Sequence, residues 1–144
     1  MSSAPPLARI NPAIALPTLG VIGGMGPLAT VDFIKKLVLG TPAHCDQEHI
    51  PLVVCSIPQI PDRTTAILEE GPSPLPELLR VLNVLERSAV DYIAIPCNTA
   101  HAFVDRMQAH LRVPVLNMLD ETMAQVAGLY PGQLVGLLAT SGTV

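Results

Sequence analysis

The sequence predicts an α/β fold built on a parallel β-sheet. The chain has 144 residues, enough for one ordinary domain with its own core, and 49% of them are hydrophobic. The apolar residues gather in short continuous runs such as residues 51–57 and 91–96, which is typical of strands buried on both faces. These runs alternate with segments of helical periodicity, and that alternation indicates right-handed βαβ units.

The first unit lies near the start of the chain. Residues 16–22 predict a strand, and the Gly-Gly-Met-Gly-Pro run at 23–27 predicts a tight turn with Pro27 near the first position of a helix. One face of this helix carries residues at helical spacing, namely Val31, Ile34, Lys35 and Val38. The Gly-Thr-Pro run at 40–42 ends the helix.

The second unit follows the same order with a longer connection. Residues 51–57 predict a second buried strand, and the proline-rich run at 58–65 predicts a loop. A second helix is expected over residues 75–88. Its apolar stripe consists of Leu78, Leu82, Leu85 and Ala89.

The third strand is expected at residues 91–96, followed by a helix from about Ala100. The apolar face of that helix carries Ala100, Phe103, Val104, Met107 and Leu111. Residues 113–116 predict a fourth strand, and Asp120 is a candidate cap for a helix that ends at Gly128.

The last segment predicts a fifth strand over residues 133–139, which leads into a strand-to-helix turn at 140–143. Three parts of the chain follow from these elements. They are a loose N-terminal tail at 1–17, an α/β lobe at 18–130, and the start of a second unit at 131–144.

Composition argues against two classes of partner. The chain has 8 basic and 12 acidic residues, a net charge of −4, 3% aromatic residues and no tryptophan, so nucleic acid is a poor partner. No run approaches the roughly 18 unbroken apolar residues of a membrane span. The first seventeen residues lack the apolar core of a signal peptide.

The cysteines indicate a reducing, cytoplasmic setting. Cys45, Cys55 and Cys97 form an odd, widely spaced set without a CxxC pair, which argues against a disulfide scaffold and a structural zinc site. His44 and His49 lie near Cys45 in a polar connection, but their spacing matches no specific metal site. A solvated loop is the favoured interpretation there, and we expect no bound metal.

Four segments fall where the strands end, and ligands of open parallel sheets bind at that edge. They are residues 23–27, 58–65, 96–99 and 140–143. The glycine-rich turn lacks GxGxxG spacing, no acidic residue ends the second strand, and no Gly-Lys-Ser/Thr occurs. Nucleotide binding is therefore weakly supported.

Cys97 is the candidate reactive group, because it lies where a buried strand ends and a helix begins. Free N–H groups at a helix start favour the thiolate, and Asn98 and Thr99 are residues of the N-capping type. The alternative is an inert, buried cysteine. Arg63 is the only arginine in the strand-end loops and suits a carboxylate, although a solvated charge explains it equally well. His101 lies four residues after Cys97 and is either beside the thiol or a hydrogen-bonded helix residue.

Three motifs in this order resemble the aspartate/glutamate racemase family. They are Leu-Gly-Val-Ile-Gly-Gly-Met-Gly-Pro at 19–27, Ile-Pro-Asp-Arg-Thr at 60–64 and Ile-Pro-Cys-Asn-Thr-Ala-His at 95–101. The aspartate racemase branch fits best. The resemblance implies a cofactor-independent amino-acid racemase with two similar α/β lobes, an active site between them, an acidic amino acid as substrate and a homodimer in the full-length form.

The resemblance also implies roles for individual residues. Cys97 is one of two catalytic cysteines, and Arg63 binds the side-chain carboxylate of the substrate. The remaining pocket residues are Met25, Asn98, Thr99 and Thr140.

The second catalytic cysteine of the family lies in the later lobe, which we expect to be largely absent from this chain. Cys45 and Cys55 lie in no matching motif. Two alternatives to a racemase therefore stay open. One is a non-catalytic module that binds acidic amino acids, and the other is a one-cysteine lyase or isomerase of small dicarboxylates.

Overall fold

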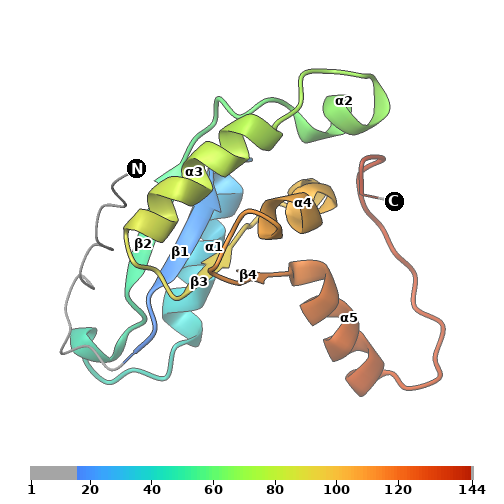
Figure 1. Ribbon diagram of the computed structural model, residues 1–144. Helices are drawn as coiled ribbons and strands as arrows, with labels where there is room; N and C mark the ends of the chain where they lie inside the picture. The colour runs from blue at the N-terminus through green and yellow to red at the C-terminus, as the bar shows by residue number, and fades with distance from the viewer. Residues whose placement is uncertain (1–15, 144) are drawn as a thin grey trace.

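A computed structural model describes residues 16–143 as a four-stranded parallel β-sheet with helices on both faces (Figure 1). Most of the predicted tail, residues 1–15, lies outside the described residues. The strands are β1 (Leu19–Gly23), β2 (Leu52–Ser56), β3 (Tyr92–Ala94) and β4 (Val115–Leu116), in the spatial order β2-β1-β3-β4. Each neighbouring pair is parallel, with Leu19 opposite both Leu52 and Tyr92. The predicted α/β fold with a parallel sheet is confirmed.

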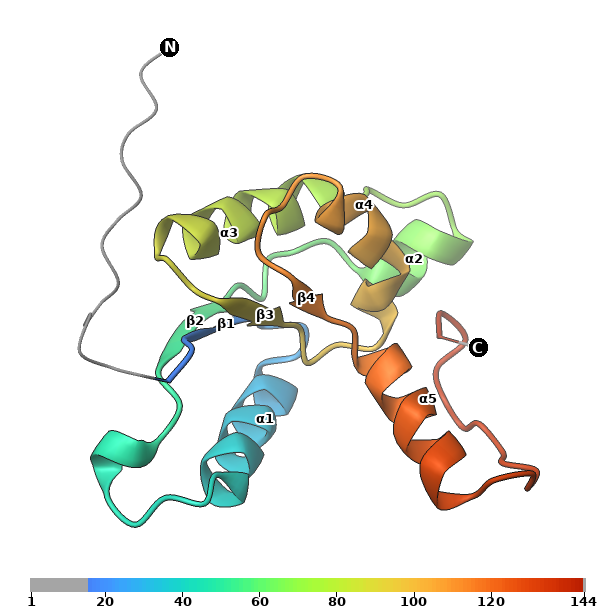
Figure 2. The ribbon, with the colours of Figure 1, turned by 60° about the horizontal axis from the view of Figure 1, so that its bottom comes forward.

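The helices form one layer on each side of the sheet (Figure 2). On one side lie α3 (Leu75–Arg87) and α4 (Val104–Gln108), and on the other lie α1 (Pro27–Gly40) and α5 (Met118–Leu129). The short helix α2 (Arg63–Leu68) lies beyond the sheet edge. Two 3₁₀ turns complete the elements, η1 (Asp46–Glu48) and η2 (Thr99–Phe103). No helix within residues 16–143 is long and apolar enough to cross a membrane.

The main core lies between the sheet and α3. Alternate residues of a strand point to opposite faces, so Ile22 and Ile93 face α3 and are fully buried. They pack with the predicted stripe of α3, of which Leu78, Leu82 and Leu85 are fully buried. On the other face a smaller cluster joins Leu19, Val21 and Ala94 to Phe33 and Leu37 of α1. Together these two clusters hold a helix against each face of the sheet.

The face of α1 that carries Val31 and Val38 is not the face that packs against the sheet. Val31 is 62% exposed and Val38 43% exposed, whereas Thr30, Phe33 and Leu37 face the sheet. The Thr30 hydroxyl sets this rotation, because it accepts a hydrogen bond from the Gly24 N–H at 2.9 Å and donates to the Gly26 carbonyl at 3.0 Å. A buried polar side chain thus fixes α1 to the strand-to-helix turn. The spacing of apolar residues in the sequence does not reveal such a contact.

The second strand is present but is not buried as predicted. β2 is one of the two edge strands, and its side chains are half-buried or exposed, with Val54 40% exposed. A continuous apolar run has the same appearance at the centre and at the edge of a sheet. Position in the sheet follows from strand pairing, which the run itself does not contain.

Two expected helices differ in their boundaries. The helix after β3 opens with the 3₁₀ turn η2 and ends at Gln108, yet it still buries Ala100, Phe103, Val104 and Met107. The capping role expected of Asp120 is wrong, because Asn117 caps α5. The Asn117 side chain accepts a hydrogen bond from the Leu119 N–H at 3.0 Å, and Asp120 lies in the first turn.

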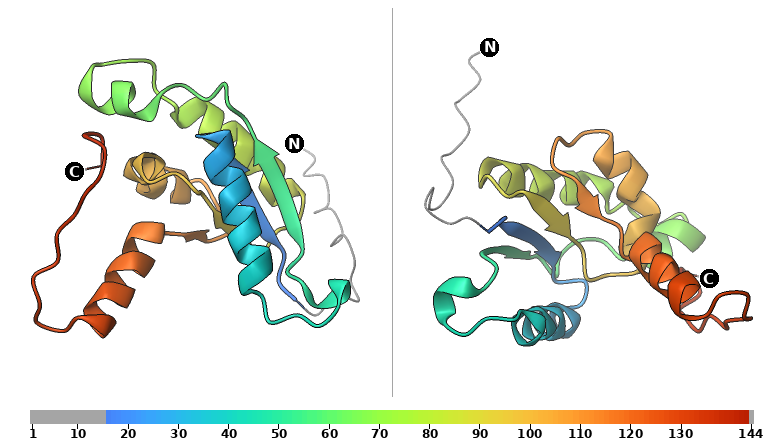
Figure 3. Two further views of the ribbon diagram at one scale, coloured as in Figure 1. Left: turned by 180° about the vertical axis from the view of Figure 1, so that it is seen from behind. Right: turned by 90° about the horizontal axis from the view of Figure 1, so that it is seen from below.

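The predicted fifth strand is wrong. Residues 133–139 form no regular structure, and Leu134 and Leu138 are fully exposed. A strand requires hydrogen-bonded neighbours, and α5 carries this segment away from β4, the near edge of the sheet (Figure 3). The turn predicted at 140–143 does form, because the Thr143 N–H donates to the Thr140 carbonyl at 2.8 Å. It brings Gly142 beside Thr64 of α2 and Thr99 of η2.

Candidate active site

The site lies where the parallel strands end, because there the turn after β1 meets the loop after β2. Gly24 has a φ of +94°, and a Cβ at this position would lie 2.5 Å from backbone atoms of Ile57. Only glycine combines this conformation with so close an approach. The Ile57 N–H also donates to the Gly23 carbonyl at 3.1 Å. The glycine-rich turn therefore serves backbone packing at the edge of the site.

All six site residues of the sequence analysis line one cavity of about 470 Å³. Residues from all four predicted strand-end segments contribute to its wall. The lining residues are Met25, Ala29, Arg63, Thr64, Pro96, Cys97, Asn98, Thr99, Leu138, Ala139, Thr140 and Thr143. The structure thus brings the predicted residues together at one edge of the sheet, and what each of them binds stays a prediction.

Two threonines of this cavity, Thr64 and Thr143, were not identified as site residues from the sequence. Thr143 lies 3.2 Å from Thr99 and 3.3 Å from Thr140, measured between the side-chain oxygens. Thr64 packs against the turn at Gly142, where a Cβ would lie 2.9 Å from its hydroxyl oxygen. The only sequence signal was their place inside two strand-end segments. The wall therefore holds a group of hydroxyls that can donate to an anion.

Arg63 lies at the first position of α2 and not in a loop as expected. The preceding residue, Asp62, caps this helix, and its Oδ1 accepts from the Thr65 N–H at 2.7 Å and from the Thr65 hydroxyl at 2.9 Å. These hydrogen bonds, with a smaller effect of the Arg63 charge, hold the pKa of Asp62 below its usual range. A lowered folded-state pKa means that the cap stabilises α2 at neutral pH and loses this effect as the pH falls through that pKa.

The Arg63 guanidinium retains unused hydrogen-bond donors. Its Nη1 donates to the carbonyls of Ile60 at 3.3 Å and Pro61 at 3.1 Å, while its buried Nε has no hydrogen-bond partner. Among residues 16–143, Arg63 forms no ion pair with a carboxylate. A buried, unpaired N–H costs free energy unless it finds an acceptor. The guanidinium is therefore prepared for an anionic ligand, and a carboxylate suits its planar geometry.

Cys97 is half-buried and lies in the turn that follows β3. Its N–H donates to the Ile95 carbonyl at 2.7 Å, and its own carbonyl faces His101 Nδ1 at 2.9 Å. The helical turn opens two residues later, at Thr99. Asn98 occupies the N-cap position without a side-chain capping bond, so the expected capping is wrong. Asn98 is instead exposed and lines the cavity.

Of the three cysteines, Cys97 alone lines this cavity. Cys45 is exposed in the connection that precedes β2, at the opposite end of the strands, and Cys55 lies within β2. Burial raises the pKa of the Cys55 thiol. Nowhere in residues 16–143 do three His, Cys, Asp or Glu side chains gather as metal ligands.

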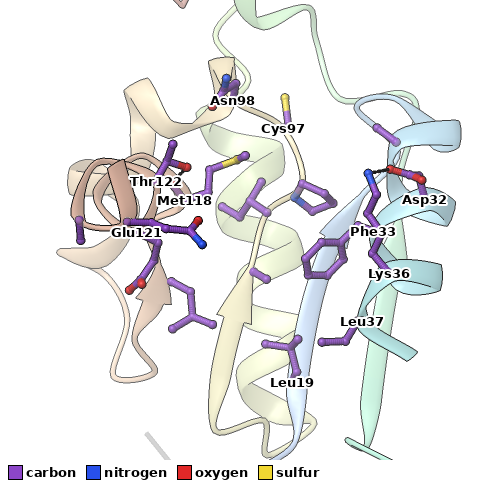
Figure 4. Close-up of a pocket in the computed structure, with 17 residues that line it drawn as sticks. Leu19, Asp32, Phe33, Lys36, Leu37, Cys97, Asn98, Met118, Glu121 and Thr122 are labelled. Atoms are coloured by element: carbon purple, nitrogen blue, oxygen red, sulfur yellow. Dashed lines mark hydrogen bonds and ion pairs between the residues drawn. The ribbon is translucent and has the colours of Figure 1, made fainter. Parts of the chain in front are cut away.

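A larger cavity of about 980 Å³ lies between α1 and α5 and shares Cys97 and Asn98 with the smaller one (Figure 4). Its floor is apolar and includes Leu19, Phe33 and Ala94, because α1 covers only part of this sheet face. The charged Lys36 at its rim is paired with Asp32 at 2.6 Å. A small acidic ligand therefore fits the Arg63 cavity better, and Cys97 lies where the two cavities meet.

The three thiols should differ in their reaction with iodoacetamide near neutral pH. We expect Cys45 and Cys97 to react faster than Cys55, because burial disfavours the Cys55 thiolate that attacks the reagent. Added aspartate should slow the alkylation of Cys97 alone, since only that thiol lines the cavity. Peptide mass spectrometry over time measures all three rates, with Cys45 as the internal control. An unchanged Cys97 rate at saturating aspartate would contradict aspartate binding in this cavity.

A parallel α/β lobe whose strand ends gather a thiol, an arginine and several hydroxyls has the architecture of the α/β proteins that place a small-molecule site at this edge of the sheet. Residues 22–144 match the family model described as Asp/Glu/hydantoin racemase, and the chain belongs to this family. It is 30% identical over 132 residues to the broad specificity amino-acid racemase RacX of Bacillus subtilis (strain 168). That alignment covers 88% of this chain and 56% of the relative.

Solved structures show the same relationship. An aspartate racemase of Picrophilus torridus has a TM-score of 0.75 and 38% identity, over 79% of this chain and 48% of that chain. An aspartate racemase homologue of Pyrococcus horikoshii, at 22% identity, shares the fold with a TM-score of 0.66, over 80% of this chain and 50% of that chain. The chain thus spans about half the length of these relatives, consistent with one lobe of the racemase fold.

Proposed function

We propose that the full-length protein is a cofactor-independent amino-acid racemase that acts on aspartate or glutamate. The observation that carries the proposal is one cavity lined by both the half-buried Cys97 and Arg63, which pairs with no carboxylate among residues 16–143. Membership of the racemase family supports the reaction class. The substrate follows from the chemistry of Arg63, because a guanidinium pairs with the second carboxylate that an acidic amino acid carries.

In the proposed reaction the Cys97 thiolate removes the Cα proton of the bound amino acid and becomes a thiol. The electron pair left at Cα delocalises into the α-carboxylate, where hydrogen-bond donors stabilise the added charge. Asn98, Thr99, Thr140 and Thr143 are the donors of the cavity wall. A second acid then delivers a proton to the opposite face of the planar carbon, which inverts its configuration.

The second acid/base group is assigned to the part of the full-length protein beyond residues 16–143. Within the described chain, Cys97 is the only cysteine at the cavity, and His101 is buried with both ring nitrogens engaged. The family resemblance supplies a second cysteine from the other lobe. We also expect a homodimer, since that is implied by the same resemblance, and a cytoplasmic setting, since all three cysteines are free.

The direct test is to incubate the full-length protein with L-aspartate in D₂O, without added cofactor. We expect D-aspartate that carries deuterium at Cα, and an undiminished rate when hydroxylamine is added to trap any pyridoxal phosphate. A parallel panel of glutamate and neutral amino acids tests whether the range is wide, as the name of the RacX relative indicates for that protein. Aspartate binding without exchange would favour the non-catalytic module, and release of ammonia would favour the lyase.

A further inference from the structure

We propose that His101 is a positioning residue that ties the Cys97 turn to the start of α5 as the neutral Nδ1–H tautomer. The kinetic part of this proposal rests on the racemase function proposed above, whereas the tautomer and its hydrogen bonds do not. His101 is 6% exposed, which makes it one of the few buried polar side chains of the described chain. A buried imidazole needs a partner for each ring nitrogen.

The partners of the two ring nitrogens determine the tautomer. The backbone N–H of Met118 can only donate, and it lies 3.2 Å from Nε2, so Nε2 accepts. In a neutral imidazole the proton then lies on Nδ1, which donates to the Cys97 carbonyl oxygen at 2.9 Å. The ring therefore bridges the backbones of two residues that line the larger cavity.

This bridge adds a second connection to the pairing of β3 with β4, in which Ala94 lies opposite Leu116, two residues before Met118. Cys97 and Met118 both line the larger cavity, and Cys97 also lines the Arg63 cavity. None of the residues of α5 is buried, so apolar packing fixes that helix only weakly. A hydrogen bond from a buried ring thus restrains both the turn that carries the thiol and the first residue of α5.

The chain offers a matched control. His110 Nδ1 lies 2.8 Å from the Arg106 carbonyl, the same four-residue contact that His101 makes with Cys97. His110 is exposed and lies outside both cavities that contain Cys97. A His110→Ala variant therefore removes the same local contact without reaching the site.

The first measurement is ¹⁵N and hydrogen-exchange NMR on the full-length protein. We expect the His101 spectrum to show a protonated Nδ1 and an unprotonated Nε2, and the Met118 amide to be protected from exchange. In His101→Ala the Met118 amide should exchange on the order of fivefold faster, the effect of one ordinary hydrogen bond. A protonated Nε2 in the native protein would overturn the proposal, whatever the protein catalyses.

The second measurement compares variants in aspartate racemisation. His101→Ala should lower kcat by about ten- to a hundredfold through misplacement of the thiol, with little change in KM because Arg63 lies on α2 and keeps its contacts. His101→Asn should recover kcat better than His101→Gln, because the Asn amide reaches the Nδ1 position and can donate to Cys97. His110→Ala should resemble the native protein.

Folding is monitored by thermal unfolding, and the Asn and Gln variants decide the result if the Ala variant does not fold. Equal kcat values for Asn, Gln and native proteins would overturn the positioning role. A native protein with no racemase activity would instead contradict the proposed function, and the NMR results would still decide the hydrogen-bonded bridge.

Discussion

Replacement of Cys97 by serine should reduce racemisation of aspartate by about 10²- to 10⁴-fold, the usual contribution of a positioned acid/base group. Serine is close to cysteine in size, so the half-buried turn after β3 can keep its backbone hydrogen bonds. Its hydroxyl, however, is far too weak an acid to supply an anionic base near neutral pH. The expected loss is therefore in kcat, while aspartate still binds.

The variant should also lose exchange at one face of the substrate in a specific way. Cys97 should act on only one face of the substrate. The variant should therefore still exchange the Cα proton of the enantiomer that the other base deprotonates, and the rate of this exchange should fall less than the rate of inversion. Cys45→Ser and Cys55→Ser are the controls, because neither thiol lines the cavity. A chiral amino-acid assay and proton NMR in D₂O measure inversion and exchange together. Native rates in Cys97→Ser would remove this residue from the mechanism.

Replacement of Arg63 by alanine should weaken the binding of aspartate about ten- to a hundredfold. A charge-assisted hydrogen bond contributes roughly 1.5–3 kcal/mol, which corresponds to that range. Alanine, which lacks a second carboxylate, should bind the variant and the native protein almost equally. Arg63 lines the cavity and pairs with no carboxylate among residues 16–143, which is the structural reason for expecting a bound carboxylate at this position.

Arg80→Ala is the matched control, because Arg80 is an exposed arginine of α3 paired with Glu77 at 2.7 Å. Removal of an exposed ion pair has little effect on stability and none is expected on aspartate binding. Isothermal titration of aspartate and of alanine into the native protein, Arg63→Ala and Arg80→Ala measures the affinity of each protein for each ligand. Equal losses for both ligands in Arg63→Ala would mean that this residue contacts the α-carboxylate or only supports the fold.

The position of the site was predictable because it depends on sheet geometry and local sequence. Parallel strands all end at one edge, so the segments that follow β1, β2 and β3 had to approach each other. Met25, Arg63 and Cys97 lie in three such segments and meet at one cavity. The state of each side chain was not predictable, because the free Nε of Arg63 and the bridge made by His101 depend on partners elsewhere in the chain.

Some structural expectations were wrong for a related reason. The apolar run at 133–139 has the composition of a strand, yet among the described residues it finds no neighbour with which to pair. The rotation of α1 follows from hydrogen bonds of Thr30 to the preceding turn, and not from the widest apolar stripe. In both cases a local pattern was compatible with more than one arrangement.

The sequence by itself determined the order of the four strands and of the helices α1, α3 and α5, the parallel sheet, the strand-end segments of the site and the racemase family. These features depend on periodicity, turn residues and short motifs, which are local properties of a chain. Only the tertiary structure decided that β2 is an edge strand, which face of α1 is buried and that His101 joins Cys97 to α5. These features depend on contacts between distant residues. The burial of a side chain and the partners of its hydrogen bonds follow from how all the helices and strands pack together.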